Sequence, residues 1–146
     1  MRTIGHDPQE QKVIDDIAQY GWHCVNILGE GAWVPFSFTI GVFKNYQHPE
    51  LIIFGLGENI AHQNLAIAVE KIHRGNPIDL ATSTDALLNE YLCCFVEVPK
   101  AQYAEHVGLC EWFYEGDDFP LFQIVWPSPQ GLFPWHPDVS PDFKLA

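Results

Sequence analysis

The stretch PFSFTIGVFKNYQHPELIIFGL, residues Pro35–Leu56, contains two apolar runs with a polar segment between them. From Phe36 to Val42, large apolar side chains alternate with Ser, Thr and Gly, which is typical of a strand with one packed face and one more open face. The run Leu51–Leu56 is continuously apolar and indicates a buried strand. We therefore predict two neighbouring core strands joined by the polar turn Lys44–Glu50.

Two helices are indicated on either side of this stretch. In Asp7-Pro8-Gln9-Glu10, an N-cap acceptor is followed by Pro at the first helical position and by Glu at the third. This pattern predicts a helix from Pro8 to Tyr20, with Gly21 after its end. An apolar stripe at helical spacing, formed by Leu65, Ala68, Val69 and Ile72, predicts a second helix from Asn59 to Arg74.

The remaining chain is predicted to be mainly strand and loop. Asn76–Glu90 has the composition of a loop, with one helical turn near Asp85. Pro99 is suited to open a short helix that ends at Val107. The segment GLCEWFYEGDDF, which starts at Gly108, fits either a helix or a loop lid. Further strands are predicted at Trp22–Leu28, Tyr91–Val98 and Pro120–Pro127.

These elements together predict an α+β fold in a single domain over residues 1–146. We expect a mostly antiparallel sheet of about five strands, packed with two main helices. The C-terminal tail is rich in proline and aromatic residues, and its prolines exclude regular structure from much of it.

Charge is the most informative bulk property of the sequence. The formal net charge is −12, and residues 75–146 hold 11 of the 19 acidic side chains but only two of the seven basic ones. A negative field repels nucleic acid and anionic membranes, and it attracts basic proteins. No apolar run approaches the ~20 residues of a membrane helix, and the N-terminus lacks an apolar signal core. We expect a cytoplasmic protein with a basic protein partner.

The densest acidic block lies in the C-terminal half and is interleaved with aromatic side chains. Aromatic anchors ringed by carboxylates are typical of a surface that binds a basic protein. The alternative is a solvated loop whose aromatic side chains point into the core. The candidate partner-binding residues are Glu105, Glu111, Trp112, Tyr114, Glu115, Asp117 and Asp118.

A second candidate site is a pocket around the predicted turn. His48 would titrate near neutral pH, and Glu50 could orient its ring. The alternative is that Pro49 fixes an ordinary turn and that Glu50 is a solvated charge at the strand edge. The candidate pocket residues are Ser37, Thr39, Lys44, His48 and Glu50.

The sequence gives no basis for a catalytic, metal or cofactor site. No hydrolase, phosphate-loop or dinucleotide motif is present. His106 and Cys110 are four residues apart, but two ligands are too few for a metal, and Gly108 weakens the helix between them. Without a signal peptide, the four cysteines are expected to be reduced and structural.

Several motifs together resemble one known family. YGWHCVNI, the Pro35–Leu56 stretch, FQIVWP and GLFPW are similar to the bacterial family called domain of unknown function 4262, and the resemblance spans about Ile14 to Trp135. The resemblance implies a small cytoplasmic α+β protein. It assigns no activity and no catalytic residue.

Two functional hypotheses follow. The first is a non-catalytic immunity protein that neutralises a basic toxin domain from interbacterial competition, because such proteins are small, cytosolic and often acidic. The second is a flavin-binding protein or oxidoreductase, because the element order resembles that of split-barrel flavin proteins. By that analogy Ser37, Thr39 and Lys44 would contact the cofactor phosphate, although the net charge opposes an anionic ligand.

Overall fold

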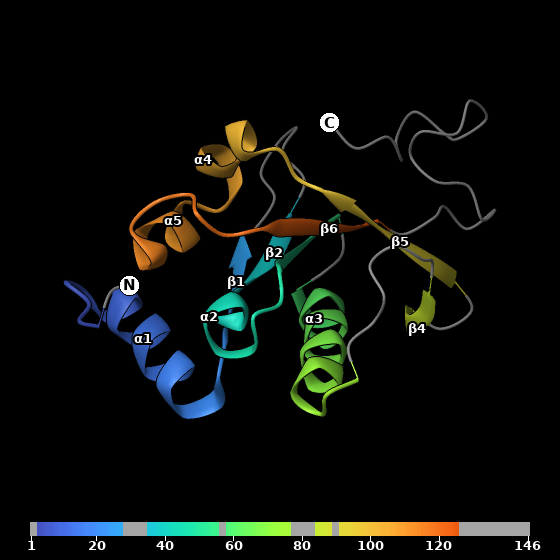
Figure 1. The fold of residues 1–146 in the computed structure, drawn as a ribbon, viewed down its shortest axis with the longest axis horizontal. Coiled ribbons are helices and arrows are strands. Elements are labelled where there is room, and N and C mark those ends of the chain that lie inside the picture. Colours follow the sequence, from blue (N-terminus) through green and yellow to red (C-terminus); the bar gives the residue numbers. More distant parts are fainter. Residues whose placement is uncertain (1–2, 28–34, 56–57, 77–83, 89–90, 126–146) are drawn as a thin grey trace.

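The computed structural model describes residues 3–27, 35–55, 58–76, 84–88 and 91–125. Helices and strands alternate irregularly along these segments (Figure 1). The elements are, in order, α1 (Pro8–Tyr20), β1 (His23–Ile27), β2 (Phe36–Ile40), α2 (Val42–Tyr46), β3 (Glu50–Phe54), α3 (Glu58–His73), β4 (Thr84–Leu88), β5 (Tyr91–Glu97), a 3₁₀ turn (Lys100–Gln102), α4 (Tyr103–His106), α5 (Gly108–Tyr114) and β6 (Leu121–Val125).

The strands form one sheet in the order β1-β2-β3-β6-β5-β4. The β3–β6 pair is parallel, with Glu50 opposite Leu121, and the other pairs described are antiparallel. β4 pairs with β5 through an irregular register at the edge. The predicted α+β fold with a mostly antiparallel sheet is therefore confirmed.

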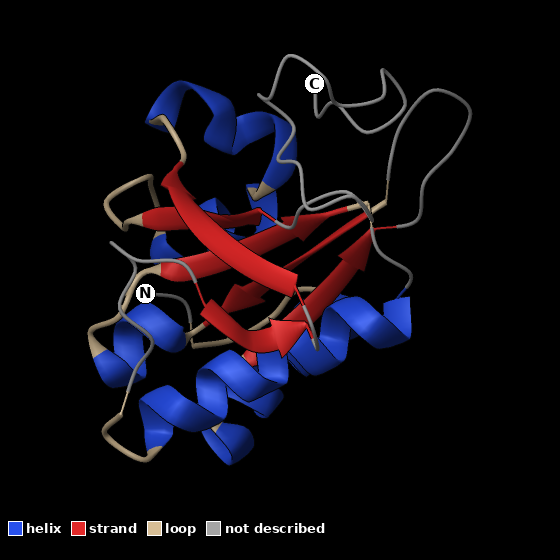
Figure 2. Ribbon diagram, turned by 90° about the vertical axis from the view of Figure 1, so that its right-hand side faces the viewer, coloured by secondary structure: helices blue, strands red, loops and turns tan. Residues whose placement is uncertain are grey.

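Helices cover both faces of the sheet (Figures 1 and 2), and each face carries its own hydrophobic core. Phe38 and Ile52 belong to a cluster that also contains buried side chains of α1, α4 and α5. Leu51 and Ile53 belong to a second cluster that contains buried side chains of α3. Because neighbouring residues of a strand point to opposite faces, the continuous apolar run of β3 serves both cores.

The two main helices lie where the sequence predicts them. The Asp7 carboxylate accepts from the Glu10 N–H at 2.8 Å, and Gly21 adopts a left-handed φ of 92° beyond the last turn of α1. The predicted inner stripe of α3 is buried; it comprises Leu65, Ala68, Val69 and Ile72.

The predicted polar turn is partly a helix. β2 ends at Ile40, Gly41 takes a φ of 102°, and the chain continues into α2. Val42, predicted to continue the strand, instead packs with Val69 and Ile72 of α3. The prediction of an open face on this strand is also wrong, because Ser37 and Thr39 are buried, at 3% and 0% exposure.

Further toward the C-terminus, one prediction is wrong and two are refined. The helical turn near Asp85 is instead strand β4, whose backbone pairs with β5. The segment that fitted a helix or a lid forms α5, and the short helix after Pro99 is a 3₁₀ turn followed by α4. The predicted tail lies outside the described residues. No helix among the described residues has the length and apolar character needed to cross a membrane.

Gly41 is expected to tolerate replacement by alanine less well than Gly75 does. A Cβ on Gly41 would lie 2.9 Å from Ile17 Cγ1, whereas a Cβ on Gly75, also at positive φ, would meet nothing within 4 Å. Gly75→Ala should cost only the left-handed strain of ~1–2 kcal/mol. Gly41→Ala should cost about 1–3 kcal/mol more, because it also overpacks the core. Urea unfolding of both variants measures the difference, and equal losses would contradict this assignment.

Candidate functional site

The most unusual polar group in the described structure is the carboxylate of Glu50, at the start of β3. Its side chain is fully buried, although glutamate is rarely buried without partners. Oε1 accepts from the Thr39 hydroxyl at 2.7 Å and from the Val42 N–H at 3.2 Å. Oε2 accepts from the N–H groups of Gly41 at 2.9 Å and Phe43 at 3.4 Å. The Tyr114 hydroxyl also donates to Oε2.

Three of these donors are backbone groups at the beginning of α2. The first N–H groups of a helix have no partner within the helix, and they attract negative charge. The left-handed conformation of Gly41 turns the chain so that its own N–H joins those of Val42 and Phe43 around the carboxylate. Glu50 therefore satisfies the N-terminus of α2 from a neighbouring strand.

Tyr114 connects this carboxylate to α5. Its hydroxyl also accepts from the Lys44 N–H at 3.2 Å, and its ring lies 5.0 Å from that of Phe119. Cys110, one turn earlier on α5, donates its thiol to the Thr39 carbonyl at 3.3 Å. The network consequently joins β2, α2, β3 and α5.

Burial controls the protonation of these groups. It raises the pKa of Glu50, and the hydrogen bonds from Tyr114, Thr39 and the backbone oppose that rise only in part. Burial and the neighbouring Glu50 raise the pKa of Tyr114 far above its usual value. Burial, with Glu50 and Glu111 adding to it, raises the pKa of the Cys110 thiol well above its usual value. At neutral pH neither α5 group supplies an anionic nucleophile.

The five predicted pocket residues do not form one pocket. Thr39 and Glu50 meet, as described, but inside the core, so the interpretation of Glu50 as a solvated edge charge is wrong. Ser37 donates to Asn26 Oδ1 at 2.7 Å. Lys44 is exposed. His48 Nδ1 donates to the Pro49 carbonyl at 2.8 Å, and partial burial lowers the His48 pKa.

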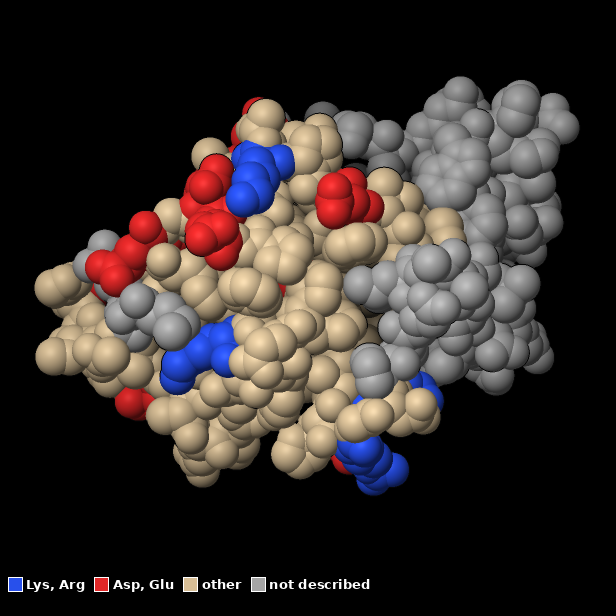
Figure 3. Space-filling model, viewed as in Figure 1, with Lys and Arg blue, Asp and Glu red and all other residues tan. Residues whose placement is uncertain are grey.

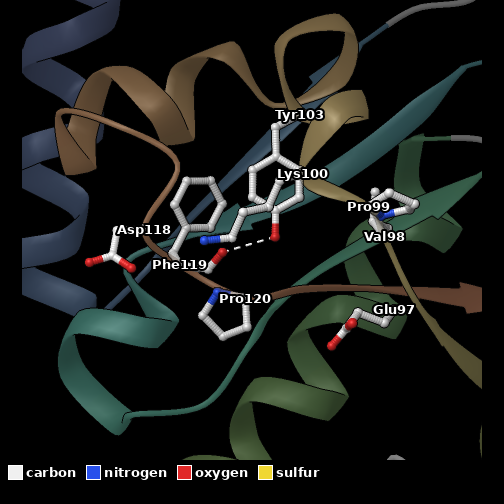
Figure 4. Close-up of a pocket in the computed structure, with 8 residues that line it drawn as sticks. All are labelled: Glu97, Val98, Pro99, Lys100, Tyr103, Asp118, Phe119 and Pro120. Carbon is white, nitrogen blue, oxygen red and sulfur yellow. Dashed lines mark hydrogen bonds between the residues drawn. The ribbon is translucent and has the colours of Figure 1, made fainter.

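An open pocket lies elsewhere, where β5 ends and β6 begins. Figure 4 shows the side chains that line it, and its volume is about 310 Å³. It is lined by Glu97, Val98, Pro99, Lys100, Tyr103, Asp118, Phe119 and Pro120. No periodic pattern in the sequence indicates this pocket, because its lining comes from two separate segments that meet where β5 pairs with β6.

The floor of this pocket is aromatic and its rim is charged. The rings of Tyr103 and Phe119 stack at 4.9 Å, and the Tyr103 hydroxyl donates to the Phe119 carbonyl at 2.9 Å. Burial, together with the charges of Glu97 and Asp117, raises the Tyr103 pKa. Glu97, Lys100 and Asp118 are exposed at the rim.

The predicted acidic block divides into an inner and an outer set. Tyr114 and Trp112 are half-buried and pack against the core cluster of α1, α4 and α5. Glu111 is also half-buried. Figure 3 shows acidic side chains gathered over the side of the molecule formed by α4, α5 and the α5–β6 connection. The exposed carboxylates of the block are Glu105, Glu115, Asp117 and Asp118.

The described residues contain no cluster of three or more His, Cys, Asp or Glu side chains suited to a metal ion. His106 and Cys110 lie on separate helices, α4 and α5, rather than on one face of one helix. The His106 ring instead lies edge-on to Phe36 and Phe54.

A protein-family model decides the relationship of this chain to known proteins. The model named "Domain of unknown function (DUF4262)" matches residues 16–140, which includes the Glu50 network and the pocket. The chain belongs to the DUF4262 family. Comparison with curated proteins and with solved structures gives no match. The DUF4262 chain therefore has to be interpreted from its own geometry.

The buried carboxylate of this DUF4262 protein should give its stability a distinct pH dependence. The native state raises the pKa of Glu50 above its usual value of 4.5. The contribution of this shift to the free energy of unfolding is therefore complete below pH 4.5 and is lost as the pH rises through the raised pKa. Glu50→Gln should destabilise the protein by ~1–3 kcal/mol at low pH, because its amide hydrogens face backbone donors. The difference between wild type and variant should shrink as the pH rises.

Denaturant unfolding at a series of pH values from about 4 to 8 measures this difference. Glu97→Gln, an exposed change on β5 at a carboxylate with no ion pair within 4 Å among the described residues, is the matched control and should leave the pH profile of wild type unaltered. A Glu50→Gln difference that grows with pH would show that the native state instead favours the ionised carboxylate.

Proposed function

We propose that this DUF4262 protein is a non-catalytic binding protein of the immunity type, which neutralises a basic toxin domain delivered by a competing bacterium. The observation that carries the proposal is the acidic surface of α4, α5 and the α5–β6 connection. The net charge of −12 supports it, because a field of this sign speeds encounter with basic proteins.

The exposed carboxylates of this surface are better placed to form ion pairs with a partner protein than within their own chain. Within the described segments, Asp117, Asp118 and Glu97 have no ion-pair partner within 4 Å. Glu105 approaches only His106, at 4.0 Å. Carboxylates that stay unpaired by their own chain can pair with Lys or Arg of a partner without first breaking an internal salt bridge.

The backbone beneath this surface is anchored. Tyr114 ends α5 and is held by the Glu50 carboxylate, and the Phe119 ring within the α5–β6 connection is buried. An interface whose backbone is already ordered loses less conformational entropy when it binds. The buried network thus supports partner binding indirectly.

The proposal is tested by co-expression. Toxin domains encoded beside the gene are each expressed in a sensitive host with and without this protein. Rescue of growth, together with a complex of fixed ratio in native mass spectrometry, is the expected result for one of them. Continued killing by every such domain, with no complex formed, would overturn the immunity proposal.

Charge reversal should locate the interface. Glu115→Lys, Asp117→Lys and Asp118→Lys together should weaken binding to the basic partner, most strongly at low salt, because added salt screens exposed charges. Each reversed contact is expected to cost ~0.2–1 kcal/mol from loss of the attraction alone. Asp15→Lys, an exposed reversal on α1, is the control. Titration calorimetry at two salt concentrations measures the affinity of wild type, of the triple variant and of the control for the partner. A triple variant that binds as tightly as wild type would place the interface away from α5.

A further inference from the structure

We propose that the hydroxyl of Tyr114 is a proton-linked latch on the end of α5. When the Glu50 carboxyl is ionised, Tyr114 donates a hydrogen bond to it and holds the last turn of α5. When the carboxyl takes up a proton, this hydrogen bond reverses, and the tyrosine hydrogen turns to solvent. The inference goes beyond the proposed function and stands without it.

The described partners of the Glu50 carboxylate are all hydrogen-bond donors. They are the N–H groups at the start of α2 and the hydroxyls of Thr39 and Tyr114. The backbone orients both hydroxyls: Thr39 Oγ1 accepts from the Leu51 N–H at 3.0 Å, and Tyr114 Oη accepts from the Lys44 N–H at 3.2 Å. This arrangement satisfies an ionised carboxylate, whereas a protonated carboxyl has a hydrogen to donate and meets only donors in it.

Proton uptake by Glu50 therefore requires one of the two hydroxyls to turn. A backbone N–H cannot accept a hydrogen bond, but a hydroxyl oxygen can. Thr39 is 0% exposed, so a Thr39 hydrogen turned away from Glu50 has no water to bond to. Tyr114 is half-buried, and its hydrogen bond with the Lys44 N–H lies at the surface. The Tyr114 hydroxyl is consequently the one of the two that can turn to water.

The step takes one proton from solvent. The Tyr114 hydrogen passes to Glu50 Oε2 while Tyr114 Oη takes a proton from water. The tyrosine is neutral before and after, and the carboxyl loses its negative charge. Glu50 then donates to Tyr114, and the bond joins two neutral groups. Such a bond has about half the strength of one to a carboxylate, so the latch is weaker after proton uptake.

Few other titratable groups take part in this network. The titratable side chains on the elements around Glu50 include Tyr114, Cys110 and Glu111 of α5, Lys44 of α2, His48 just before β3, Asp117 and Asp118 of the α5–β6 connection, and Asp16 of α1 with His23 of β1. Among these, Tyr114 bonds to the carboxylate, and Cys110 donates to the Thr39 carbonyl. Asp16 and His23 bond to each other, and the side chains of Lys44, Asp117 and Asp118 are exposed.

The latch acts on the last turn of α5. Tyr114 is the final residue of this helix, and Glu115 after it adopts a left-handed φ of 58°. The N–H of Gly116 donates to the Glu111 carbonyl at 3.0 Å and closes the turn. Cys110 and Phe113 are buried in the core, so the earlier part of α5 keeps its place. A weaker latch should therefore open the last turn more often without moving the whole helix.

Carbon NMR of the full-length protein tests the reversal directly. Glutamate Cδ and tyrosine Cζ are labelled with ¹³C, and spectra are recorded in equal parts of H₂O and D₂O from about pH 4 to 8, the range in which a buried glutamate titrates. A tyrosine whose hydroxyl hydrogen exchanges slowly gives a pair of Cζ signals, one for each isotope, whereas fast exchange gives a single signal. Tyr114 should give the pair above the midpoint of the Glu50 titration and the single signal below it.

Tyr103 is the matched control within the same spectra. Its hydroxyl donates to the Phe119 carbonyl at 2.9 Å, which is a backbone acceptor that does not titrate. Its pair of signals should persist through the whole pH range. A Tyr114 pair that also persists below the Glu50 midpoint would overturn the latch. A single Tyr114 signal at every pH, or a Glu50 signal that does not titrate in this range, would overturn it as well.

Tyr114→Phe removes the hydroxyl and keeps the ring. At neutral pH, amide hydrogen exchange of Gly116 should be about fivefold faster in this variant than in wild type, as expected for the loss of one hydrogen bond. Tyr103→Phe is the matched variant and should leave Gly116 exchange unchanged. Equal Gly116 exchange in wild type and Tyr114→Phe would show that other contacts hold the end of α5, and it would overturn the proposal.

Discussion

The hydrogen bonds that converge on the Glu50 carboxylate are the interaction on which the rest of the structure depends. They join the end of β2, the first turn of α2, the start of β3 and the last residue of α5 at one buried point. A buried carboxylate without these donors would be strongly destabilising, so each of the four elements is required in its place. In the short helix α2, the N–H groups of Val42 and Phe43 donate to Glu50, and that of Lys44 donates to the Tyr114 hydroxyl.

The Glu50 network lies between two sets of polar groups, one in the interior of the protein and one on its surface. Inside, Glu50 and Cys110 are buried and Tyr114 is half-buried, and the polar groups of all three are hydrogen-bonded to one another or to backbone. Outside, Asp117 and Asp118 face solvent and have no ion-pair partner within 4 Å among the described residues. The proposed function depends on the exposed carboxylates for partner binding. It depends on the buried groups only because they hold α5 in position.

The sequence predicts the elements that interactions between neighbouring residues stabilise. It does not predict the features that depend on contacts between residues far apart in the chain. Capping residues and the apolar stripe fix α1 and α3. The burial of Glu50 has no local signal, because Tyr114 is 64 residues away and a lone glutamate beside proline resembles a surface turn. β4 lacks strand periodicity and exists through its pairing with β5. The pocket likewise arises from strand pairing, although Asp118 was recognisable as part of the acidic block.

The parallel β3–β6 pair has a consequence for the order of events during synthesis. β3 begins at Glu50, but its neighbour toward the sheet centre, β6, begins only at Leu121. The antiparallel β1–β2–β3 segment can form early on the ribosome from neighbouring chain, whereas the edge of β3 waits for β6. Until then that edge exposes unpaired backbone groups next to a continuously apolar strand. A nascent chain stalled before residue 121 is therefore expected to be the species most dependent on chaperones.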